Sequence, residues 1–504
     1  MSTLPPFRPI GELLRELAAA RPDHTALVQG ERRLPWGELD ALADRVAAAL
    51  QRDGVQPREA VALCGANSIE YAALFLGALR AGAAVAPLPA GATPAQLAGM
   101  VADSGARLLF ADAAVPALDI VVPRIAMDGS AKPTFADWLA APGARPAAVQ
   151  PQPDWAFNII YSSGTTGTPK GIVQAHAMRW AHMARAEAGR YGPGSVTLLA
   201  TSLCSNTTLV SFFPALARGG TVVLTQGRFD PGAYLALAER ERATHAMLVP
   251  VQYQRLMAHP QFDRFDLSSF VMKFCTSAHF PATLKAQVLR RWPGGLMEYY
   301  GMSEGGGTCI LAAHEFPHKL HTVGRPAEGH DIRLIDEDGR EVPPGEVGEV
   351  VGRSPSMMVG YHRQPQKTRE AEWYDAEGRR YIRTGDVGRF DEDGFLILLD
   401  RRKDMVISGG FNIYPSDLEA VLRGHPAVRD VAVIGVPSPE WGETPVAWVV
   451  AGDDAPDPEA LRAWANERLG KTQRLSELRY LGELPRSDIG KVLKRQLRER
   501  WLAD

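Results

Sequence analysis

The stretch YSSGTTGTPKG, residues 161–171, follows a short apolar run, FNII, and gathers three glycines, five serine or threonine residues and one lysine into eleven positions. Glycine lets the backbone turn tightly and point its N–H groups at anionic oxygens, hydroxyl groups add donors, and the Lys170 ammonium supplies a point charge. The stretch therefore predicts a loop that cradles phosphate. It is not a Walker A loop, because the GxxxxGK[ST] spacing is absent, and this excludes the P-loop class of nucleotide hydrolases.

Short apolar runs alternate with helical patterns on both sides of this loop. Apolar residues between 39 and 50 recur at the spacing of a helix, and the run AVALCG at 60–65 follows as a buried strand. Further apolar runs that read as strands stand at 107–112, 221–226 and 245–250. Strands that alternate with helices predict an α/β fold, in which parallel sheets carry helices on their faces.

The pattern changes after about residue 320. Short alternating strands separated by Gly and Asp turns, as in YIRTGDVGRFDEDGFLILLDRR, predict antiparallel hairpins. A mixed pattern then returns, with a helix near 415–423 and a polar helix at the C-terminus. We therefore expect a large N-terminal region at 1–399, β-rich from about 320, and a small, mobile α+β domain at 401–504, with Asp400 as the hinge between them.

The composition suits a globular chain that acts on small molecules. It has 504 residues, of which 45% are hydrophobic and 22% charged, so the chain holds several structural units and little disorder. The formal net charge is -3 with no basic stripe, which disfavours a nucleic-acid partner. The longest apolar run is interrupted by Arg80, and the N-terminus lacks the unbroken apolar stretch of a secretion signal. We expect no membrane insertion and a cytoplasmic location, and both monomer and homodimer stay open.

The cysteines, Cys64, Cys204, Cys275 and Cys309, are widely spaced and form no CxxC pair. The sequence therefore predicts neither a disulfide framework nor a zinc site. Each cysteine is interpreted as a small buried apolar residue.

Further motifs follow the loop along the chain. They are YYGMSE at 299–304, TVGRP at 322–326, TGD at 384–386, DRRKDMVISGGFNIYP at 400–415 and LPRSDIGKVLKR at 484–495. Together with the loop, and in this order, they resemble the adenylate-forming superfamily, which includes acyl-CoA synthetases, nonribosomal adenylation domains and firefly luciferase. The resemblance covers nearly the whole chain. It implies an enzyme that converts a carboxylate and ATP to acyl-AMP and pyrophosphate, and then passes the acyl group to the thiol of coenzyme A.

The resemblance also implies residues for ATP and Mg²⁺. Thr165 and Glu304 would hold Mg²⁺, Tyr300 would stack on adenine, and Asp386 would accept hydrogen bonds from the ribose hydroxyls. A carboxylate beside a phosphate loop makes physical sense if a cation lies between them. The residues implied for ATP or AMP are Ser162, Ser163, Gly164, Thr165, Thr166, Gly167, Lys170, Ser277, Ala278, Tyr300, Gly301, Ser303, Asp386 and Arg401.

Lys491 matches the catalytic lysine of the superfamily and would act with Glu304 and Lys170. A mobile ammonium group that reaches both the attacking carboxylate and the α-phosphate stabilises charge on the pentacoordinate phosphorus. The alternative for Lys491 is a solvated lysine beside a basic helix.

The same resemblance implies a second pose for the acyl transfer. The C-terminal domain would rotate about Asp400 after adenylation. Gly409 and Gly410 would then line the pantetheine tunnel, where a backbone without side chains leaves room. Trp441 is either a contact to the coenzyme A nucleotide or a packing aromatic residue.

The acid itself is less well defined. An amino-acid substrate would require an aspartate near Asn206 to hold its ammonium group, so the asparagine disfavours that class. Many acyl-CoA and aryl-CoA ligases carry a histidine where Ser205 stands, and His279 is a candidate substitute. The glycines after Glu304 leave either a flat slot for an aromatic acid or a tunnel for an alkyl chain, and we favour an aromatic or hydroxycinnamate-like acid over a fatty acid. The expected wall residues are Ser205, Asn206, Thr207, Ser277, Ala278, His279, Gly305, Gly306 and Gly307.

Two alternatives to a CoA ligase follow from the same motifs. One is a stand-alone adenylation enzyme that loads a carrier protein, although no carrier domain follows residue 504. The other is a non-catalytic nucleotide-binding regulator, which is disfavoured because Glu304 and Lys491 are both retained. Luciferase-like oxidation has no support beyond the shared motifs.

Overall fold

The computed structural model describes residues 5–162, 170–408, 411–452, 454–487 and 490–503. The chain divides into two compact units. The N-terminal unit comprises Met1–Asp331 with Gly352–Ile382, and the C-terminal unit comprises Ile332–Val351 with Arg383–Asp504. The hinge at Asp400 stays a prediction.

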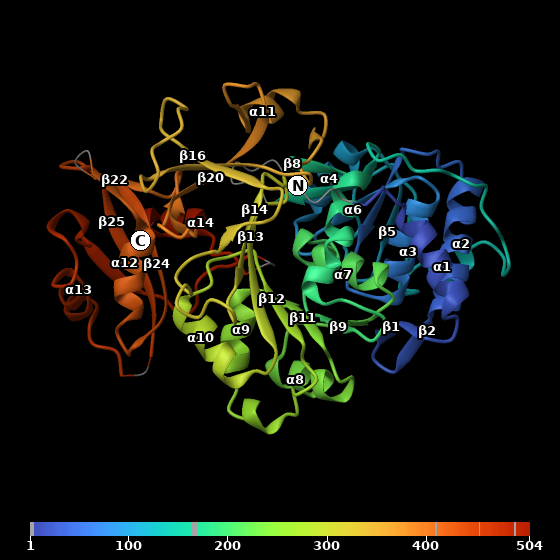
Figure 1. Ribbon diagram of the computed structural model, residues 1–504, viewed down its shortest axis with the longest axis horizontal. Helices are drawn as coiled ribbons and strands as arrows, with labels where there is room; N and C mark the ends of the chain where they lie inside the picture. The colour runs from blue at the N-terminus through green and yellow to red at the C-terminus, as the bar shows by residue number, and fades with distance from the viewer. Residues whose placement is uncertain (1–4, 163–169, 409–410, 453, 488–489, 504) are drawn as a thin grey trace. The chain divides into compact units, whose positions relative to one another are not determined.

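A nine-stranded sheet forms one half of the N-terminal unit (Figure 1). The strands, in their order across the sheet, are β15 (Arg325–Pro326), β14 (Thr308–Ala312), β13 (Gly295–Gly301), β12 (Met272–Cys275), β11 (His245–Leu248), β9 (Val196–Leu199), β10 (Thr221–Leu224), β1 (Thr25–Gln29) and β2 (Arg32–Pro35). The strands from β13 to β1 pair in parallel, and antiparallel strands complete both edges. The carboxyl ends of the central strands therefore share one edge of the sheet, where ligands bind in such folds.

A seven-stranded sheet forms the other half. Its strands, in order, are β18 (Gly360–Tyr361), β8 (Lys170–Ala175), β7 (Ala156–Ser162), β4 (Ala84–Leu88), β3 (Ala60–Cys64), β5 (Ala106–Ala111) and β6 (Arg124–Ala126). The pairs from β7 to β6 are parallel, whereas β8 pairs antiparallel with both β7 and β18. The predicted phosphate loop is the connection between β7 and β8.

Helices pack on both sheets. Those of the N-terminal unit are α1 (Ile10–Ala20), α2 (Trp36–Arg52), α3 (Ile69–Arg80), α4 (Pro94–Ser104), α5 (Phe135–Trp138), α6 (His176–Ala184), α7 (Asn206–Ala217), α8 (Pro231–Arg240), α9 (Pro250–Met257), α10 (Ala282–Arg291) and α11 (Pro365–Glu370). Every residue of α3 except Glu70 is buried, and this helix contacts β3 and β4 of one sheet and β1 of the other. The Ser68 hydroxyl accepts a hydrogen bond from the Tyr71 N–H and so caps its first turn.

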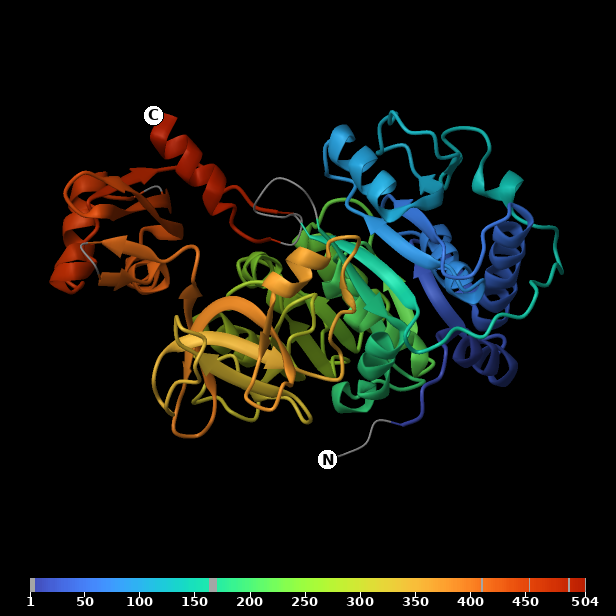
Figure 2. The same ribbon diagram turned by 90° about the horizontal axis from the view of Figure 1, so that it is seen from above.

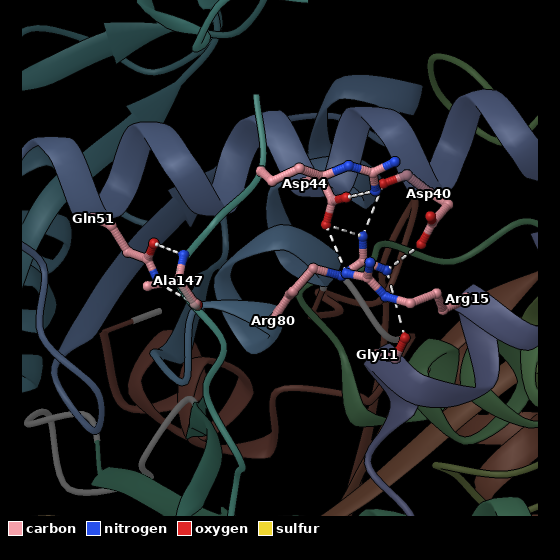
Figure 3. A network of polar contacts seen from close by, with 8 residues as sticks. Gly11, Arg15, Asp40, Asp44, Gln51, Arg80 and Ala147 are labelled. Carbon is pink, nitrogen blue, oxygen red and sulfur yellow. Dashed lines mark hydrogen bonds and ion pairs between the residues drawn. The ribbon is translucent and has the colours of Figure 1, made fainter. Parts of the chain in front are cut away.

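A buried ionic network, here called the scaffold network, ties α1, α2 and α3 together (Figure 3). Asp44, only 1% exposed, accepts from Arg15 and Arg80 at 2.8 and 2.7 Å and also pairs with Arg145. Arg80 donates further to the Asp40 carboxylate at 2.5 Å. The network joins residues far apart in sequence and fixes how the three helices pack.

The C-terminal unit contains a second kind of sheet. Its strands, in order, are β23 (Phe411–Ile413), β22 (Val406–Ser408), β25 (Gly442–Ala451) and β24 (Val428–Ser438), with β26 (Glu477–Tyr480) paired to β25. Helices α12 (Pro415–Arg423) and α13 (Pro458–Asn466) and the last helix, α14 (Lys494–Ala503), pack on this sheet (Figure 2). The helix predicted near 415–423 is confirmed, with Pro415 at its first turn.

The region after residue 320 forms antiparallel pairs, as predicted. The order of this sheet is β16 (Asp331–Ile335), β17 (Gly348–Arg353), β20 (Arg380–Phe390) and β19 (Glu372–Tyr374), with β21 (Leu396–Arg401) paired to β20. The pairs β19 with β20 and β20 with β21 are antiparallel. The predicted fold class is confirmed: parallel α/β sheets dominate the N-terminal part, and a small α+β part follows.

The cysteine prediction is correct in part. Cys64, Cys275 and Cys309 are buried and none of the described cysteines forms a disulfide, but Cys204 is only half-buried. It precedes α7 in a turn that reaches the surface, which spacing in the sequence does not reveal. Among the helices that the structure describes, none is long and apolar enough to cross a membrane.

Candidate active site

Predicted acid-wall residues meet at the carboxyl edge of the nine-stranded sheet. Ser277, just after β12, has a φ of 84°, a conformation that residues other than glycine seldom adopt. Its hydroxyl is hydrogen-bonded to that of Thr207, in the first turn of α7. The Thr276 hydroxyl donates to the Tyr299 carbonyl at 2.8 Å and ties this loop to β13. The strained residue therefore sits where three elements converge.

The start of α7 gives two other wall residues definite partners. The Ser205 hydroxyl accepts from the Thr207 N–H at 3.2 Å and caps the helix. Asn206 is half-buried at the first helical position, and its Oδ1 accepts from the Gln174 Nε2 at 3.3 Å. The serine that replaces the expected histidine thus has a structural reason to be there.

Lys170 and Glu304 contact the same side chain, that of Tyr361. The Lys170 Nζ lies 5.0 Å from the centre of the Tyr361 ring, a cation–π contact. The Tyr361 hydroxyl donates to the Glu304 Oε1 at 2.9 Å. Burial and the neighbouring Glu304 carboxylate raise the pKa of Tyr361, so its hydroxyl stays a donor. The end of the phosphate loop and the predicted metal ligand therefore lie at one place.

The donor set at Glu304 fits Mg²⁺. This ion is commonly held by one or two carboxylates together with phosphate oxygens and water. No cluster of three or more His, Cys, Asp or Glu residues occurs in the part of the chain that the structure describes, so no protein-only metal cage competes. Thr165, the other predicted ligand, lies outside the described residues.

Close packing explains why glycines follow Glu304. A Cβ at Gly305 would lie 1.7 Å from the Ser356 carbonyl oxygen, and one at Gly306 would lie 2.6 Å from the Ile382 Cβ. Gly305 and Gly307 also have φ values of 72° and 93°. The space on these Cβ sides is filled, so any open slot or tunnel must lie on another side of the backbone.

The other predicted residues of the N-terminal unit are distributed around this edge. Tyr300 is half-buried in β13, Gly301 is exposed at its end, and Ala278 and Ser303 are half-buried in the loops after β12 and β13. His279 is exposed. Ser163, Gly164, Thr165, Thr166 and Gly167 lie outside the described residues, as does the side chain of Ser162.

The C-terminal unit brings Asp386 and Arg401 together. They face each other across β20 and β21, and the Arg401 Nε lies 3.3 Å from the Asp386 Oδ1. Gly385, with a φ of 71°, bends the strand, and the Thr384 hydroxyl accepts from the Asp386 N–H at 3.0 Å. The TGD motif is thus a turn that presents the carboxylate beside a guanidinium.

Lys491 lies three residues before the start of α14. Its N–H donates to the Ser487 hydroxyl at 3.2 Å, and its carbonyl accepts from the Ser487 N–H at 2.8 Å. Gly490 has a φ of 76°, and Arg486 pairs with Val492. These contacts hold the backbone of Lys491 beside Ser487.

The remaining predictions fall on the same unit. The Asp400 carboxylate accepts from the Arg401 and Ser416 N–H groups at 2.7 and 3.0 Å, and burial raises its pKa. Trp441 is 52% exposed. Gly409 and Gly410 lie outside the described residues.

Sequence reasoning missed Tyr361 and the buried residues Gln174 and Arg179. Tyr361 stands in VGYHR, a stretch with no signal of its own, and its role appears only when β18 pairs with β8. Gln174 and Arg179 did carry a signal, because polar residues there interrupt an otherwise apolar pattern in IVQAHAMRWAHM.

Comparison with known proteins gives matches over nearly the whole chain. The sequence profile "AMP-binding enzyme" matches residues 14–362, and the profile "AMP-binding enzyme C-terminal domain" matches residues 417–491. Feruloyl-CoA synthase of Amycolatopsis sp is 35% identical over 490 residues, which cover 96% of this chain and 97% of that protein.

Two further proteins are similar over the same extent. Long-chain-fatty-acid–CoA ligase FadD13 of Mycobacterium tuberculosis is 31% identical over 511 residues, covering 98% of this chain and 99% of that protein. The structure of amide bond synthetase McbA from Marinactinospora thermotolerans has a TM-score of 0.87 and 32% identity, covering 98% of this chain and 100% of that one.

Proposed function

The chain belongs to the AMP-binding enzyme family and is an ATP-dependent carboxylate–CoA ligase, and we propose that its acid is aromatic or hydroxycinnamate-like. The carboxylate attacks the α-phosphate of ATP, which releases pyrophosphate and leaves acyl-AMP. The thiol of coenzyme A then attacks the acyl carbon, and AMP departs. Division into two steps turns an unreactive carboxylate into a mixed anhydride.

The observation that carries the proposal is the contact of Lys170 and Glu304 with Tyr361. Lys170 would bind the β- or γ-phosphate, and Glu304 would hold Mg²⁺ against the same triphosphate. The ion, when bound, neutralises phosphate charge. Tyr361 would keep the Glu304 carboxylate oriented through its hydrogen bond of 2.9 Å.

Residues of the C-terminal unit would complete the chemistry. Asp386 would bind the ribose hydroxyls beside Arg401. Lys491 would stabilise the charge that builds on the α-phosphate during attack by the carboxylate. For the transfer to coenzyme A we propose a rotation of the C-terminal domain about Asp400 and a stacking contact at Trp441, which leaves about half of its surface, 52%, accessible.

The preference for an aromatic acid has two supports. Feruloyl-CoA synthase, named for an aromatic acid, is 35% identical, whereas the long-chain-fatty-acid ligase is 31% identical. The predicted wall also carries polar groups, namely the Asn206 amide and the Thr207 and Ser277 hydroxyls, which suit oxygen substituents better than a plain alkyl chain. A cytoplasmic location stays a prediction.

A substrate panel tests the acid. Benzoates, hydroxycinnamates and C4 to C16 fatty acids would be compared by pyrophosphate release in the presence of coenzyme A and Mg²⁺. We expect the best aromatic acid to exceed the best fatty acid at least about tenfold in kcat/KM, a ratio worth about 1.4 kcal/mol. A fatty acid that wins by that margin would overturn the preference. Acid-dependent pyrophosphate release without any CoA thioester would point to another acceptor, and no release with any acid would point to a regulator.

The role of Lys491 has its own test. Lys491→Ala should lower adenylate formation by a factor on the order of 10³, since an electrostatic contact to the transition state is lost. Thioester formation from supplied acyl-AMP should largely survive. Lys471→Ala, which removes an exposed lysine of the same unit, is the matched control. Equal losses in both half-reactions would contradict the assignment.

A further inference from the structure

Arg179, on α6, is a buried cation without a counter-charge. Its exposed fraction is 0%, and among the residues that the structure describes it forms no ion pair. Burial lowers the pKa of Arg179 to about 9, so the guanidinium remains charged at pH 7. A buried charge of this kind is costly. The chain keeps it in the N-terminal unit, close to the proposed active site.

The guanidinium binds two side-chain amides. Its Nε donates to the Asn158 Oδ1 at 3.0 Å, and its Nη2 donates to the Gln174 Oε1. Asn158 and Gln174 are direct partners across β7 and β8, the strands that flank the phosphate loop, and both are fully buried. Arg179 therefore contacts a side chain from each of these two strands.

These contacts fix the direction of every amide. Arginine is only a donor, so it must face the amide oxygens of Asn158 and Gln174. The Gln174 Oε1 also accepts from the Asn158 Nδ2 at 2.8 Å. The Gln174 Nε2 is then forced to the opposite side, where it donates to the Ser303 carbonyl at 2.6 Å and to the Asn206 Oδ1 at 3.3 Å.

The last contact determines how Asn206 is turned. Its oxygen faces Gln174, so its Nδ2, a donor, is directed away from Gln174. The side chain is only half-buried, at the carboxyl edge of the sheet and one residue before Thr207. A donor at this position attracts a hydrogen-bond acceptor and repels an ammonium group.

We propose that Arg179 and Gln174 are positioning residues that turn the Asn206 amide nitrogen toward the acid, so that the site selects acids with an oxygen acceptor at this position. This inference rests on the proposed role of Asn206 as a wall of the acid site. It adds that the chain of contacts from Arg179, and not Asn206 alone, sets the specificity.

A purely structural role explains the arrangement less well. Apolar side chains of similar volume would fill the same space without a buried charge. The Arg179 Nη1 is buried and has no hydrogen-bond partner within the described residues, which is also true of the Arg80 Nε. The Arg179 atoms that do have partners, Nε and Nη2, are those that orient Asn158 and Gln174.

Gln174→Glu is the decisive variant. The glutamate is nearly isosteric and gives Arg179 a counter-charge, but it loses the hydrogen bond to the Ser303 carbonyl, so a purely structural role predicts a change in thermal stability with unchanged kinetics. The carboxylate cannot donate, so we expect Asn206 to flip and present its oxygen to the acid. The KM for the best acid of the panel should rise about tenfold, with kcat changed less than about threefold. An unchanged KM in the folded variant overturns the proposal.

A set of three matched acids tests directly whether the Asn206 amide has turned. 3-Phenylpropanoate, 2-hydroxy-3-phenylpropanoate and phenylalanine differ only in the group on the carbon next to the carboxyl group. Gln174→Glu should move the kcat/KM ratio of phenylalanine to the hydroxy acid at least about fivefold toward phenylalanine. A ratio that stays constant counts against the proposal.

Two further variants keep the proposal falsifiable if Gln174→Glu fails to fold. Asn206→Asp, at a half-exposed position, replaces the donor with an acceptor and should give the same shifts in KM and in the ratio. Arg179→Met should raise the KM for the acid while the KM for ATP stays within about twofold.

Lys273→Met is the control, because Lys273 is a buried cation whose hydrogen bonds, within the described residues, go to the Trp292, Pro293 and Gly294 carbonyls. It should lower stability and leave every KM unchanged.

The experiment separates this inference from the proposed function. If Asn206→Ala leaves the KM of every acid unchanged, Asn206 is not a wall and the proposed acid site is wrong. If Asn206→Ala changes the KM but Gln174→Glu and Arg179→Met do not, the acid site stands and the positioning role is wrong.

Discussion

Two buried arginines of the N-terminal unit, Arg80 and Arg179, differ in the groups that bind their guanidinium charge. Arg80, in the scaffold network, pairs with Asp40 and Asp44, and Arg15 and Arg145 also bind Asp44 (Figure 3). Arg179 has no carboxylate among its described neighbours and binds amides instead. In the first arrangement, carboxylates neutralise the buried guanidinium. The second uses a charge to orient neutral groups.

The difference teaches where stability and where specificity are expected to lie. The scaffold network joins α1, α2 and α3, whereas the Arg179 contacts end at Ser303 and Asn206, beside the predicted metal ligand and acid wall. Loss of the first should lower the stability of the protein, and loss of the second should change its choice of acid.

The largest expected effect is on the scaffold network. Asp44→Asn removes the charge that three arginines share and leaves Arg80 buried with fewer partners, so we expect the free energy of unfolding to fall by about 3–5 kcal/mol. Urea unfolding followed by circular dichroism would measure it. Asp263→Asn, at an exposed aspartate, is the control and should change it by less than about 0.5 kcal/mol. A loss below about 1 kcal/mol for Asp44→Asn would remove the distinction between the two arginines.

Arg179→Met should have a smaller effect on stability. The two amides lose a donor, but the cost of burying an unpaired cation is also removed. We therefore expect the free energy of unfolding to fall by only about 1–2 kcal/mol. Urea unfolding would measure this as well. A fall in the free energy of unfolding as large as that of Asp44→Asn would show that Arg179, like the scaffold network, serves mainly stability.

Acid unfolding sharpens the comparison further. Burial, followed by the Arg179 charge, lowers the pKa of His182 to about 3, and burial lowers the pKa of His245 to about 4. An unfolded histidine titrates near pH 6.5, so the unfolded state binds more protons below that pH, and stability falls as the pH drops from 6.5 toward the folded pKa. Arg179→Met should raise the pKa of His182, and because burial still holds that pKa low, the gain appears only near pH 3, where about 1 kcal/mol should be recovered relative to its own value at pH 7. Unfolding curves at the two pH values would measure this, and an equal acid loss in both proteins would contradict it.

The smallest expected effect lies at an exposed contact of α2 outside the scaffold network. The Gln51 side chain donates to the Ala147 carbonyl and accepts from the Ala147 N–H at 3.0 and 2.7 Å, both in exposed surroundings (Figure 3). Gln51→Ala should lower the free energy of unfolding by about 0.5 kcal/mol. Thermal unfolding would detect this as a small fall in Tm, and a fall as large as that of Asp44→Asn would mean that exposure does not separate the two.

The sequence by itself determined the fold class, the positions of several helices and strands, and the order of the motifs. These depend on local patterns: apolar periodicity placed α2, a short apolar run placed β3, and Pro415 marked the start of α12. The sequence also led to Lys170, Glu304, Asp386 and Lys491, because each stands in a short motif whose residue types already indicate phosphate, metal or ribose chemistry.

Only the tertiary structure decided which side chains meet. Tyr361 joins Lys170 to Glu304 only because β18 pairs with β8, and Arg179 reaches Asn206 only through Gln174. Such contacts link residues far apart in the chain, and their free energy comes from shared burial, which no local pattern encodes. The same packing fills the Cβ sides of Gly305 and Gly306, where the sequence alone left a slot and a tunnel equally open.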